Sequence, residues 1–328
     1  MRIVYVLPHA GRCGGVRVIA EHVSRLNARG HDVQVWGLTG SFTGWFPRSV
    51  PHRLFPHTDQ LGDALQQFDG RKAATFWVTA SWVASNLRPG ERGFYLVQDE
   101  DQLTYSGDGS GSSYKLGLTL ITEGEFVTQE IERKHGVRCH NVGIGYDDVA
   151  FRPLPMIRER LRVLTPYRPH AGGNDLKGWN LALDVWHRIH ATVPGSSLVT
   201  FGDSPRPRNV TGPHIHLAGI SDAKLREVYS QSGVFLHTAK HEGFGLPMLE
   251  AMACGLPVVC TDSHGNREFC RNGDTAIVAN DAGGLAAGCM SVMSNDEQFR
   301  SLSESGLRES SRYRWEPVID RLEAVFSS

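Results

Sequence analysis

The chain of 328 residues lacks an excess of charge of either sign. Its 34 Lys and Arg side chains nearly balance its 35 Asp and Glu side chains, whereas a dedicated nucleic-acid-binding protein normally carries a basic excess. The six cysteines include no Cys-x-x-Cys pair and are too few for a disulfide scaffold, so we expect them to be reduced in an intracellular protein. No apolar run approaches the ~20 residues that span a membrane, and the run after Arg2 is too short for a secretory signal. These absences predict a cytoplasmic protein that binds no nucleic acid, and they leave peripheral contact with the inner face of a membrane open.

Two series of short apolar runs alternate with amphipathic segments along the chain. In the first half we expect strands at 3–7, 33–36, 74–78 and 94–97, and helices at 16–26 and 124–135. In the second half we expect strands at 161–164, 197–201, 234–237 and 258–260, and helices at 178–190, 222–231, 247–254 and 312–328. This alternation predicts an α/β protein with two doubly wound domains, which a turn-rich stretch around 141–160 divides.

The segment 241–255 carries the clearest signal for a functional site. Pro247 suits the first turn of a helix, and Gly255 suits the position just after its end. The helix therefore begins directly after a loop with two glycines, whose free N–H groups would bind an anion or sugar oxygens. Glu242 precedes this loop, and Glu250 lies eight residues further on. The pattern alone fits a capped helix with two surface glutamates equally well, and a pair of glutamates also occurs in glycoside hydrolases.

Signals for other chemistries are weaker. Gly11-x-x-Gly14-Gly15 is neither a dinucleotide-binding fingerprint nor a P-loop, which argues against an NAD enzyme. His214 and His216 share one face of an expected strand, but no third ligand stands at a telling spacing. We therefore expect no bound metal and no cofactor.

The stretch Glu242-x7-Glu250, within E-G-F-G-L-P-x-x-E-A-M-A-C-G-x-P-V-V, resembles the signature of retaining GT-B glycosyltransferases of family GT4. The resemblance extends over nearly the whole chain, through Gly14-Gly15, Tyr167-Arg168 and Lys177-Gly178. It implies a GT-B fold, in which two Rossmann-like domains face each other across a cleft. Residues 1–150 would form the acceptor-side domain, onto which the helix 312–328 crosses back, and residues 151–311 would form the donor domain.

The resemblance also implies roles for particular residues. Arg168 and Lys177 would bind the donor diphosphate and stabilise the leaving group, and Glu242 would hold the donor sugar. The other implied donor contacts are the backbone of Gly243, Phe244, Gly245 and Leu246 for the sugar, Glu250 for the ribose, Ile220 for the base, and Gly14 and Gly15 for the diphosphate or sugar.

Two features depart from the common pattern of that family. The loop 169–176 is long, which puts the position of Lys177 relative to the diphosphate in question. Gln98-Asp99 stands where many relatives carry His-Asp, and it is similar to a branch that contains rhamnosyltransferases of surface-glycan assembly. Gln98 and Asp99 are therefore candidates for the acceptor side, together with the segments 42–55 and 106–113. Gln98 fits equally well as a strand-end amide that satisfies backbone groups.

These expectations combine into one predicted function. The chain would be a hexosyltransferase of polysaccharide biosynthesis that moves a sugar, with retention and without metal, from a UDP-, GDP- or dTDP-sugar to a hydroxyl of a glycan, lipid or small molecule. Alternatives on the same architecture are a sugar-nucleotide epimerase, a phosphorylase, and a non-catalytic protein that binds nucleotide sugars or glycans.

Overall fold

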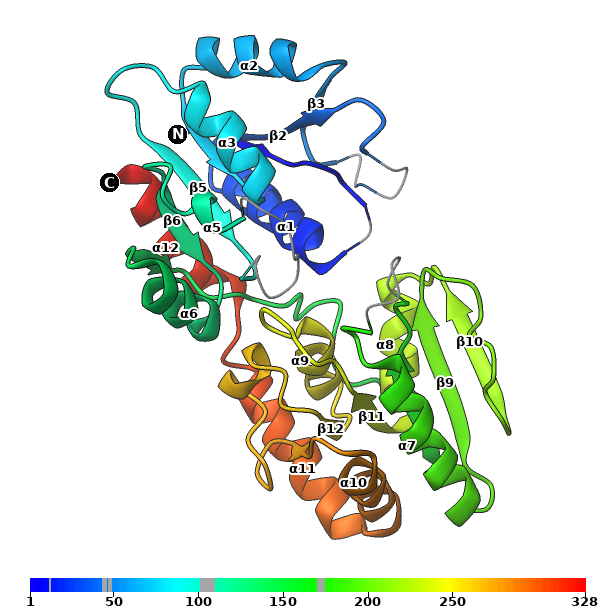
Figure 1. The fold of residues 1–328 in the computed structure, drawn as a ribbon. Helices are drawn as coiled ribbons and strands as arrows, with labels where there is room; N and C mark the ends of the chain where they lie inside the picture. Colours follow the sequence, from blue (N-terminus) through cyan, green and yellow to red (C-terminus); the bar gives the residue numbers. More distant parts are fainter. Residues whose placement is uncertain (12, 43–45, 47–48, 101–109, 170–174) are drawn as a thin grey trace. The chain divides into compact units, whose positions relative to one another are not determined.

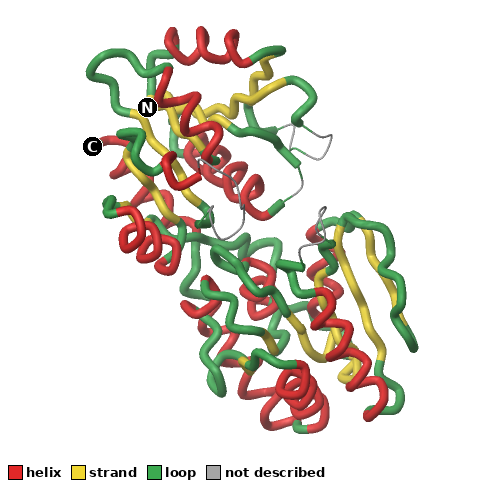
Figure 2. Tube along the Cα trace, viewed as in Figure 1, coloured by secondary structure: helices red, strands yellow, loops and turns green. Residues whose placement is uncertain are grey.

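The computed structural model describes residues 1–328 apart from 12, 43–45, 47–48, 101–109 and 170–174. The chain divides into two units, Met1–Ile144 with Trp315–Ser328, and Gly145–Arg314. Each is a parallel sheet with helices packed against it (Figures 1 and 2). The predicted α/β class with two doubly wound, Rossmann-like domains is confirmed.

The first unit contains a seven-stranded parallel sheet in the order β3-β2-β1-β4-β5-β6-β7. Its strands are β1 (Arg2–Val6), β2 (Asp32–Leu38), β3 (His52–Phe55), β4 (Arg71–Ala74), β5 (Gly93–Val97), β6 (Thr119–Thr122) and β7 (Cys139–Asn141). Its helices are α1 (Gly14–Ala28), α2 (Thr58–Gln67), α3 (Trp77–Ser85), α5 (Ser110–Ser113), α6 (Glu125–His135) and α12 (Trp315–Ser327). From β1 the chain adds β2 and β3 on one side of the sheet and then β4 to β7 on the other. The strand order therefore reverses between β1 and β4, and doubly wound sheets bind ligands at such a point.

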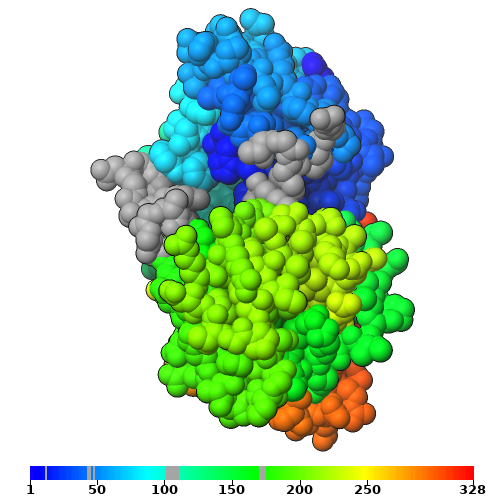
Figure 3. Space-filling view, turned by 90° about the vertical axis from the view of Figure 1, so that its right-hand side faces the viewer, coloured from blue at the N-terminus to red at the C-terminus, as the bar shows by residue number. Residues whose placement is uncertain are grey.

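The second unit contains a six-stranded parallel sheet in the order β10-β9-β8-β11-β12-β13. Its strands are β8 (Glu159–Pro166), β9 (Ser197–Gly202), β10 (His214–Ala218), β11 (Ser232–His237), β12 (Val258–Cys260) and β13 (Ile277–Val278). Its helices are α7 (Trp179–Thr192), α8 (Asp222–Gln231), α9 (Leu246–Ala253), the 3₁₀ turn η1 (Gly265–Glu268), α10 (Ala282–Ser294) and α11 (Asp296–Ser310). The strand order reverses between β8 and β11. At one edge of the sheet is β10, which belongs to the yellow-green part of the surface in Figure 3.

The last helix packs within the first unit although it follows the second unit in sequence. Phe326 is fully buried, with its ring 4.9 Å from that of Phe94 and 6.1 Å from that of Tyr5. Arg29, the residue directly after α1, donates to Asp320 of α12 at 2.6 Å and to Glu323 of α12 at 2.7 Å. Apolar burial, at about 25 cal/mol per Å², contributes more to this attachment than such partly exposed ion pairs.

The strand expected at 74–78 is wrong beyond its first residue. The strand β4 ends at Ala74, and α3 begins at Trp77. The hydroxyl of Thr79 accepts hydrogen bonds from the N–H groups of Thr75 and Phe76, both at 3.0 Å. This cap starts a helix in a stretch whose β-branched and aromatic residues favour a strand.

Candidate functional site

An ion pair joins Lys177 and Glu242 in the second unit. Lys177 Nζ donates to Glu242 Oε2 at 2.9 Å, and Glu242 Oε1 lies 3.4 Å from Nε2 of His237. Lys177 follows β8, whereas His237 ends β11 and Glu242 follows it. The structure thus brings two of the predicted catalytic residues together beyond the carboxyl ends of adjacent strands, at the point where the strand order reverses.

The environment of Glu242 keeps its carboxylate ionised. Burial acts to raise the pKa of Glu242, but the charge of Lys177 and the hydrogen bond with His237 outweigh burial and hold this pKa well below its usual range. The side chain of Glu242 is 17% exposed and that of Lys177 is 31% exposed. A carboxylate and an ammonium group are therefore both available to a ligand at one place.

The long loop 169–176 does not separate Lys177 from Glu242. Residues 170–174 lie outside the described part of the chain, but the loop's end is anchored to the segment after β11, where the N–H of Lys240 donates to the Leu176 carbonyl at 2.9 Å. Gly178 has φ +70°, and a Cβ there would lie 1.8 Å from the Thr238 carbonyl oxygen, so this close approach requires glycine. Asp175 accepts the N–H groups of the first two residues of α7, at 2.7 and 2.9 Å.

The glycine loop 243–246 leads into α9, as the sequence predicts. Gly245 precedes the helix with φ +105°, and Pro247 lies in its first turn. The Phe244 side chain is buried, with its ring 5.2 Å from Phe269 and 5.6 Å from Tyr313. The Phe244 ring therefore anchors the loop to the core of the unit. Only the backbone of Phe244 can contact a ligand.

Glu250 has partners different from those of Glu242. It is 6% exposed within α9, and the Tyr229 hydroxyl lies 3.4 Å from its Oε2 and 3.3 Å from the Pro247 carbonyl. The two glutamates of the motif are thus held by separate contacts. Arg168 is exposed shortly after β8, and Ile220 is half-buried two residues after β10.

The predicted residues of the first unit gather at the start of α1. Gly14 and Gly15 form its first two positions, and Gln98 follows β5. Gln98 Nε2 donates to the Gly15 carbonyl at 3.1 Å and to Glu123 Oε2 at 2.9 Å. A Cβ on Gly15 would lie 2.5 Å from Gln98 Oε1, so the helix start and the amide are closely packed. The amide of Gln98 thus satisfies backbone and buried groups, one of the two roles that the sequence left open.

Glu123, which follows β6, is a buried residue that the sequence analysis missed. It is 4% exposed, and burial raises its pKa to about 8 against a smaller opposite effect of Gln98. Its Oε1 lies 3.6 Å from Nε2 of His22, whose pKa burial and Arg25 lower to about 3. At neutral pH this pair is therefore largely uncharged. A lone acidic residue after an apolar run was the only available signal.

A hollow of about 220 Å³ opens beside Gln98 in the first unit. It is lined by residues that follow β1, β4 and β5, among them Pro8, Gly15, Thr75, Gln98 and Asp99. The structure thus places both acceptor-side candidates at the reversal of strand order. Of the predicted segments 42–55 and 106–113, residues 43–45, 47–48 and 106–109 lie outside the described part of the chain.

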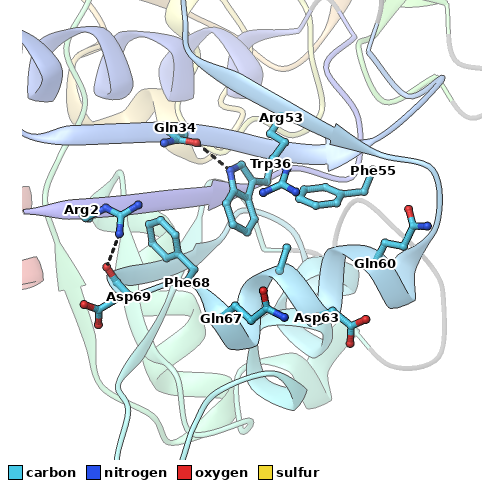
Figure 4. Close-up of a pocket in the computed structure, with 11 residues that line it drawn as sticks. Arg2, Gln34, Trp36, Arg53, Phe55, Gln60, Asp63, Gln67, Phe68 and Asp69 are labelled. Carbon is cyan, nitrogen blue, oxygen red and sulfur yellow. Dashed lines mark hydrogen bonds between the residues drawn. The ribbon is translucent and has the colours of Figure 1, made fainter.

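A larger hollow of about 550 Å³ lies between α2 and the strands β2 and β3 (Figure 4). The guanidinium group of Arg53 stacks 4.6 Å from the ring centre of Phe55, and that of Arg2 lies 5.0 Å from the ring centre of Phe68. Arg53 and Phe55 belong to the predicted acceptor-side segment 42–55, whereas none of the individually predicted site residues lines this hollow.

The described residues contain no group of three or more His, Cys, Asp or Glu side chains that could hold a metal ion. His214 Nε2 and His216 Nδ1 both lie 2.8 Å from the hydroxyl of Thr200 on β9, so these strand residues pair with a neighbouring strand. In the part of the chain that the structure describes, every helix is too short or too polar to cross a membrane.

Comparison with known proteins connects this geometry to a family. Residues 170–295 match the family model described as "Glycosyl transferases group 1". The O-antigen chain mannosyltransferase B of Escherichia coli is 33% identical over 103 residues, which are 31% of this chain and 26% of that protein. The O-antigen biosynthesis protein RfbC of Myxococcus xanthus is 27% identical over 261 residues, 76% of this chain and 20% of that protein. The chain therefore spans about a quarter or less of the length of these two relatives.

Solved structures match over the full chain. Anabaena Alr3699/HepE in complex with UDP-glucose has a TM-score of 0.84 and 13% identity, covering 100% of this chain and 99% of that one. WaaG, a glycosyltransferase involved in lipopolysaccharide biosynthesis, has a TM-score of 0.79 and 15% identity, covering 99% and 100%. Because the sequence identities are so low, these structural similarities show the fold alone. The predicted resemblance is confirmed: the chain has the fold of the GT-B glycosyltransferases, and residues 170–295 of its second unit match the group 1 glycosyl transferases.

Proposed function

We propose that this chain transfers a sugar from a nucleotide-diphosphate donor to an acceptor hydroxyl, with retention of configuration and without a metal ion. The observation that carries the proposal is the Lys177–Glu242 pair beside the glycine loop that opens α9. It supplies a cation for phosphate, a carboxylate for sugar hydroxyls and free N–H groups at a helix start, all beyond the carboxyl ends of β8 and β11.

The chemistry assigned to this pair is the stabilisation of a leaving group. Lys177, together with Arg168, neutralises the charge that develops on the diphosphate when the bond to the sugar breaks. Glu242 stays ionised and accepts hydrogen bonds from sugar hydroxyls. In the proposed front-face route the leaving phosphate takes the acceptor proton, so that the chain needs no nucleophile of its own.

The remaining predicted residues complete the proposed donor site. Glu250 accepts hydrogen bonds from the ribose hydroxyls, and Ile220 contacts the base. Gly14 and Gly15 contact the diphosphate or the sugar. The donor is a UDP-, GDP- or dTDP-sugar. UDP-glucose in the complex of Alr3699/HepE supports the first, and the similarity of Gln98-Asp99 to the rhamnosyltransferase branch supports the last.

The acceptor side is proposed at the hollow beside Gln98 and Asp99. Its acceptor is a hydroxyl of a glycan, lipid or small molecule, and the names of the relatives, O-antigen and lipopolysaccharide proteins, favour a surface glycan. A protein with this role would work in the cytoplasm, at or near the inner face of the membrane.

A thermal-shift panel with UDP, GDP, ADP and dTDP, each with and without its sugar, tests the proposal first. A ligand that binds only the folded state raises the melting temperature through mass action, so one base should give a distinct shift. Transfer to an acceptor, with the product's anomeric configuration read by NMR, then tests retention.

The same assays separate the alternatives. An epimerase converts the donor without an acceptor, and a phosphorylase requires phosphate. A non-catalytic binding protein shifts with ligand but transfers nothing, and its Glu242→Ala variant keeps full biological activity. No shift with any nucleotide and no transfer would contradict the proposal.

A further inference from the structure

His264 has a backbone conformation that residues other than glycine rarely adopt. Its φ is +73° and its ψ is −74°, which is outside the left-handed helical region as well as the common ones. The N–H of Gly265 donates to the Ser263 carbonyl at 3.1 Å, so His264 is the central residue of a γ-turn with positive φ. This turn is the rare, strained form.

Hydrogen bonds on both sides hold the strained turn in place. The N–H of His264 donates to Asp262 Oδ1 at 3.2 Å, and Arg267 clamps both oxygens of Asp262 at 2.7 and 2.9 Å. Asn266 accepts the N–H of Ser263 at 3.0 Å and donates to the Thr261 carbonyl at 2.8 Å. Such strain persists only where the surroundings over-determine the conformation, and it concentrates at functional sites.

The turn is bonded directly to Glu242. The N–H of Glu242 donates to the Ser263 carbonyl at 2.9 Å, and the Glu242 carbonyl accepts the N–H of Gly265 at 3.1 Å. A Cβ on Gly265 would lie 2.2 Å from the Gly243 carbonyl oxygen, so the turn and the glycine loop pack backbone against backbone. The conformation of His264 therefore fixes both backbone hydrogen bonds of Glu242.

The ring of His264 bonds to the residue before Glu242. Nδ1 of His264 lies 3.0 Å from Nδ1 of His241, which is 6% exposed. Because a bond between two ring nitrogens needs one donor and one acceptor, one ring carries its proton at Nδ1 and the other does not. Any other residue at position 264 breaks this contact, so glycine would relieve the strain and still lose the bond.

We propose that His264 is a positioning residue for sugar recognition: the strained turn and the His241–His264 bond hold Glu242 in the orientation that accepts sugar hydroxyls. The inference rests on the proposed function, because it takes Glu242 as the contact to the donor sugar. It assigns to His264 a part in orienting Glu242 for the sugar and no contact of its own with the nucleotide. Of the proposed nucleotide partners, Glu250 is held separately by Tyr229, whereas Lys177 bonds to Glu242 itself.

Calorimetric titration of His264→Gly with the nucleotide diphosphate and with its sugar conjugate tests this assignment, using the base that the thermal-shift panel selects. We expect about tenfold weaker affinity for the nucleotide sugar, a clearly smaller loss for the bare diphosphate because only Lys177 among its partners bonds to Glu242, and a melting temperature equal to or above that of the wild type. A purely structural role would lower the melting temperature and weaken both ligands alike. Equal affinity of variant and wild type for the sugar conjugate would overturn the proposal.

Three further variants isolate the cause. His264→Ala also lacks the ring but keeps the strain, so it should match the glycine variant in affinity and melt at a lower temperature. The double variant His241→Ala with His264→Ala should lose no more affinity than either single variant, because each substitution removes the same His241–His264 interaction. Asn209→Gly is the control for strain relief alone, since Asn209 has φ +64° in the exposed loop between β9 and β10.

The outcome also separates this inference from the proposed function. If the wild type binds no nucleotide sugar, the proposed function fails. If the wild type binds it and His264→Gly binds it equally well, the inference alone fails.

Discussion

Replacement of Lys177 by alanine tests the centre of the proposed site. The variant leaves the Glu242 carboxylate with His237 as its remaining named partner in the described structure. At 2.9 Å and an effective dielectric constant of 20, the lost attraction is about 6 kcal/mol before desolvation. Since Lys177 is 31% exposed, desolvation and solvent screening offset most of this, and we expect a net loss of about 1–3 kcal/mol in stability at neutral pH.

The sign of the pH dependence follows from the depressed pKa of Glu242. The stabilisation is present above the unfolded-state pKa, near 4.5, and is lost as the pH falls toward the folded-state value. The difference between wild type and Lys177→Ala should therefore be largest near pH 7, where about 1–3 kcal/mol corresponds to roughly 2–12 °C in melting temperature, and should shrink below pH 4.5.

Thermal melts of both proteins at pH 7 and pH 4, with nucleotide titrations at pH 7, make the measurement. Lys224→Ala is the matched control, because Lys224 also binds a carboxylate, Glu227, at 2.7 Å but is 50% exposed. It should change stability by less than about 1 kcal/mol. A Lys177→Ala variant that melts like the wild type at pH 7 and binds the nucleotide diphosphate with unaltered affinity would refute both the electrostatic reasoning and the phosphate role.

Three other predictions address the remaining groups. Glu250→Ala should weaken nucleotide binding by about 1–3 kcal/mol in calorimetry, and unchanged affinity would remove Glu250 from the donor site. Because burial raises the pKa of Glu123 to about 8, the stability of the wild type relative to Glu123→Gln should fall as the pH rises from about 4.5 to 8, as read from thermal melts of the two proteins. If the melting temperatures of the wild type and Glu123→Gln changed in parallel with pH, the raised pKa of the Glu123 carboxyl would be contradicted. Turnover should persist in excess chelator, and complete loss that Mg²⁺ or Mn²⁺ restores would contradict a metal-free reaction.

The sequence by itself determined the architecture and the local form of the central motif. Alternation of apolar strands and amphipathic helices predicted a parallel sheet in each half, because buried parallel strands and their crossover helices leave distinct periods. The short strands β3, β6, β7 and β13 were not among those expected. Pro247 and the glycines around it predicted where α9 begins. The strand expected at 74–78 was wrong because one side-chain cap, by Thr79, outweighs the strand preference of its neighbours.

Only the tertiary structure decided which groups meet. Lys177 and Glu242 are 65 residues apart in the chain, and they pair because β8 and β11 are neighbours in the sheet. The sequence shows Glu123 only as a lone acidic residue after an apolar run and does not single out His264. The first acquires its pKa from burial, and the second acquires its role from a backbone conformation that the surrounding hydrogen bonds impose. Periodicity and turn chemistry are local properties of the chain, whereas burial, pairing and strain depend on contacts between segments far apart in sequence.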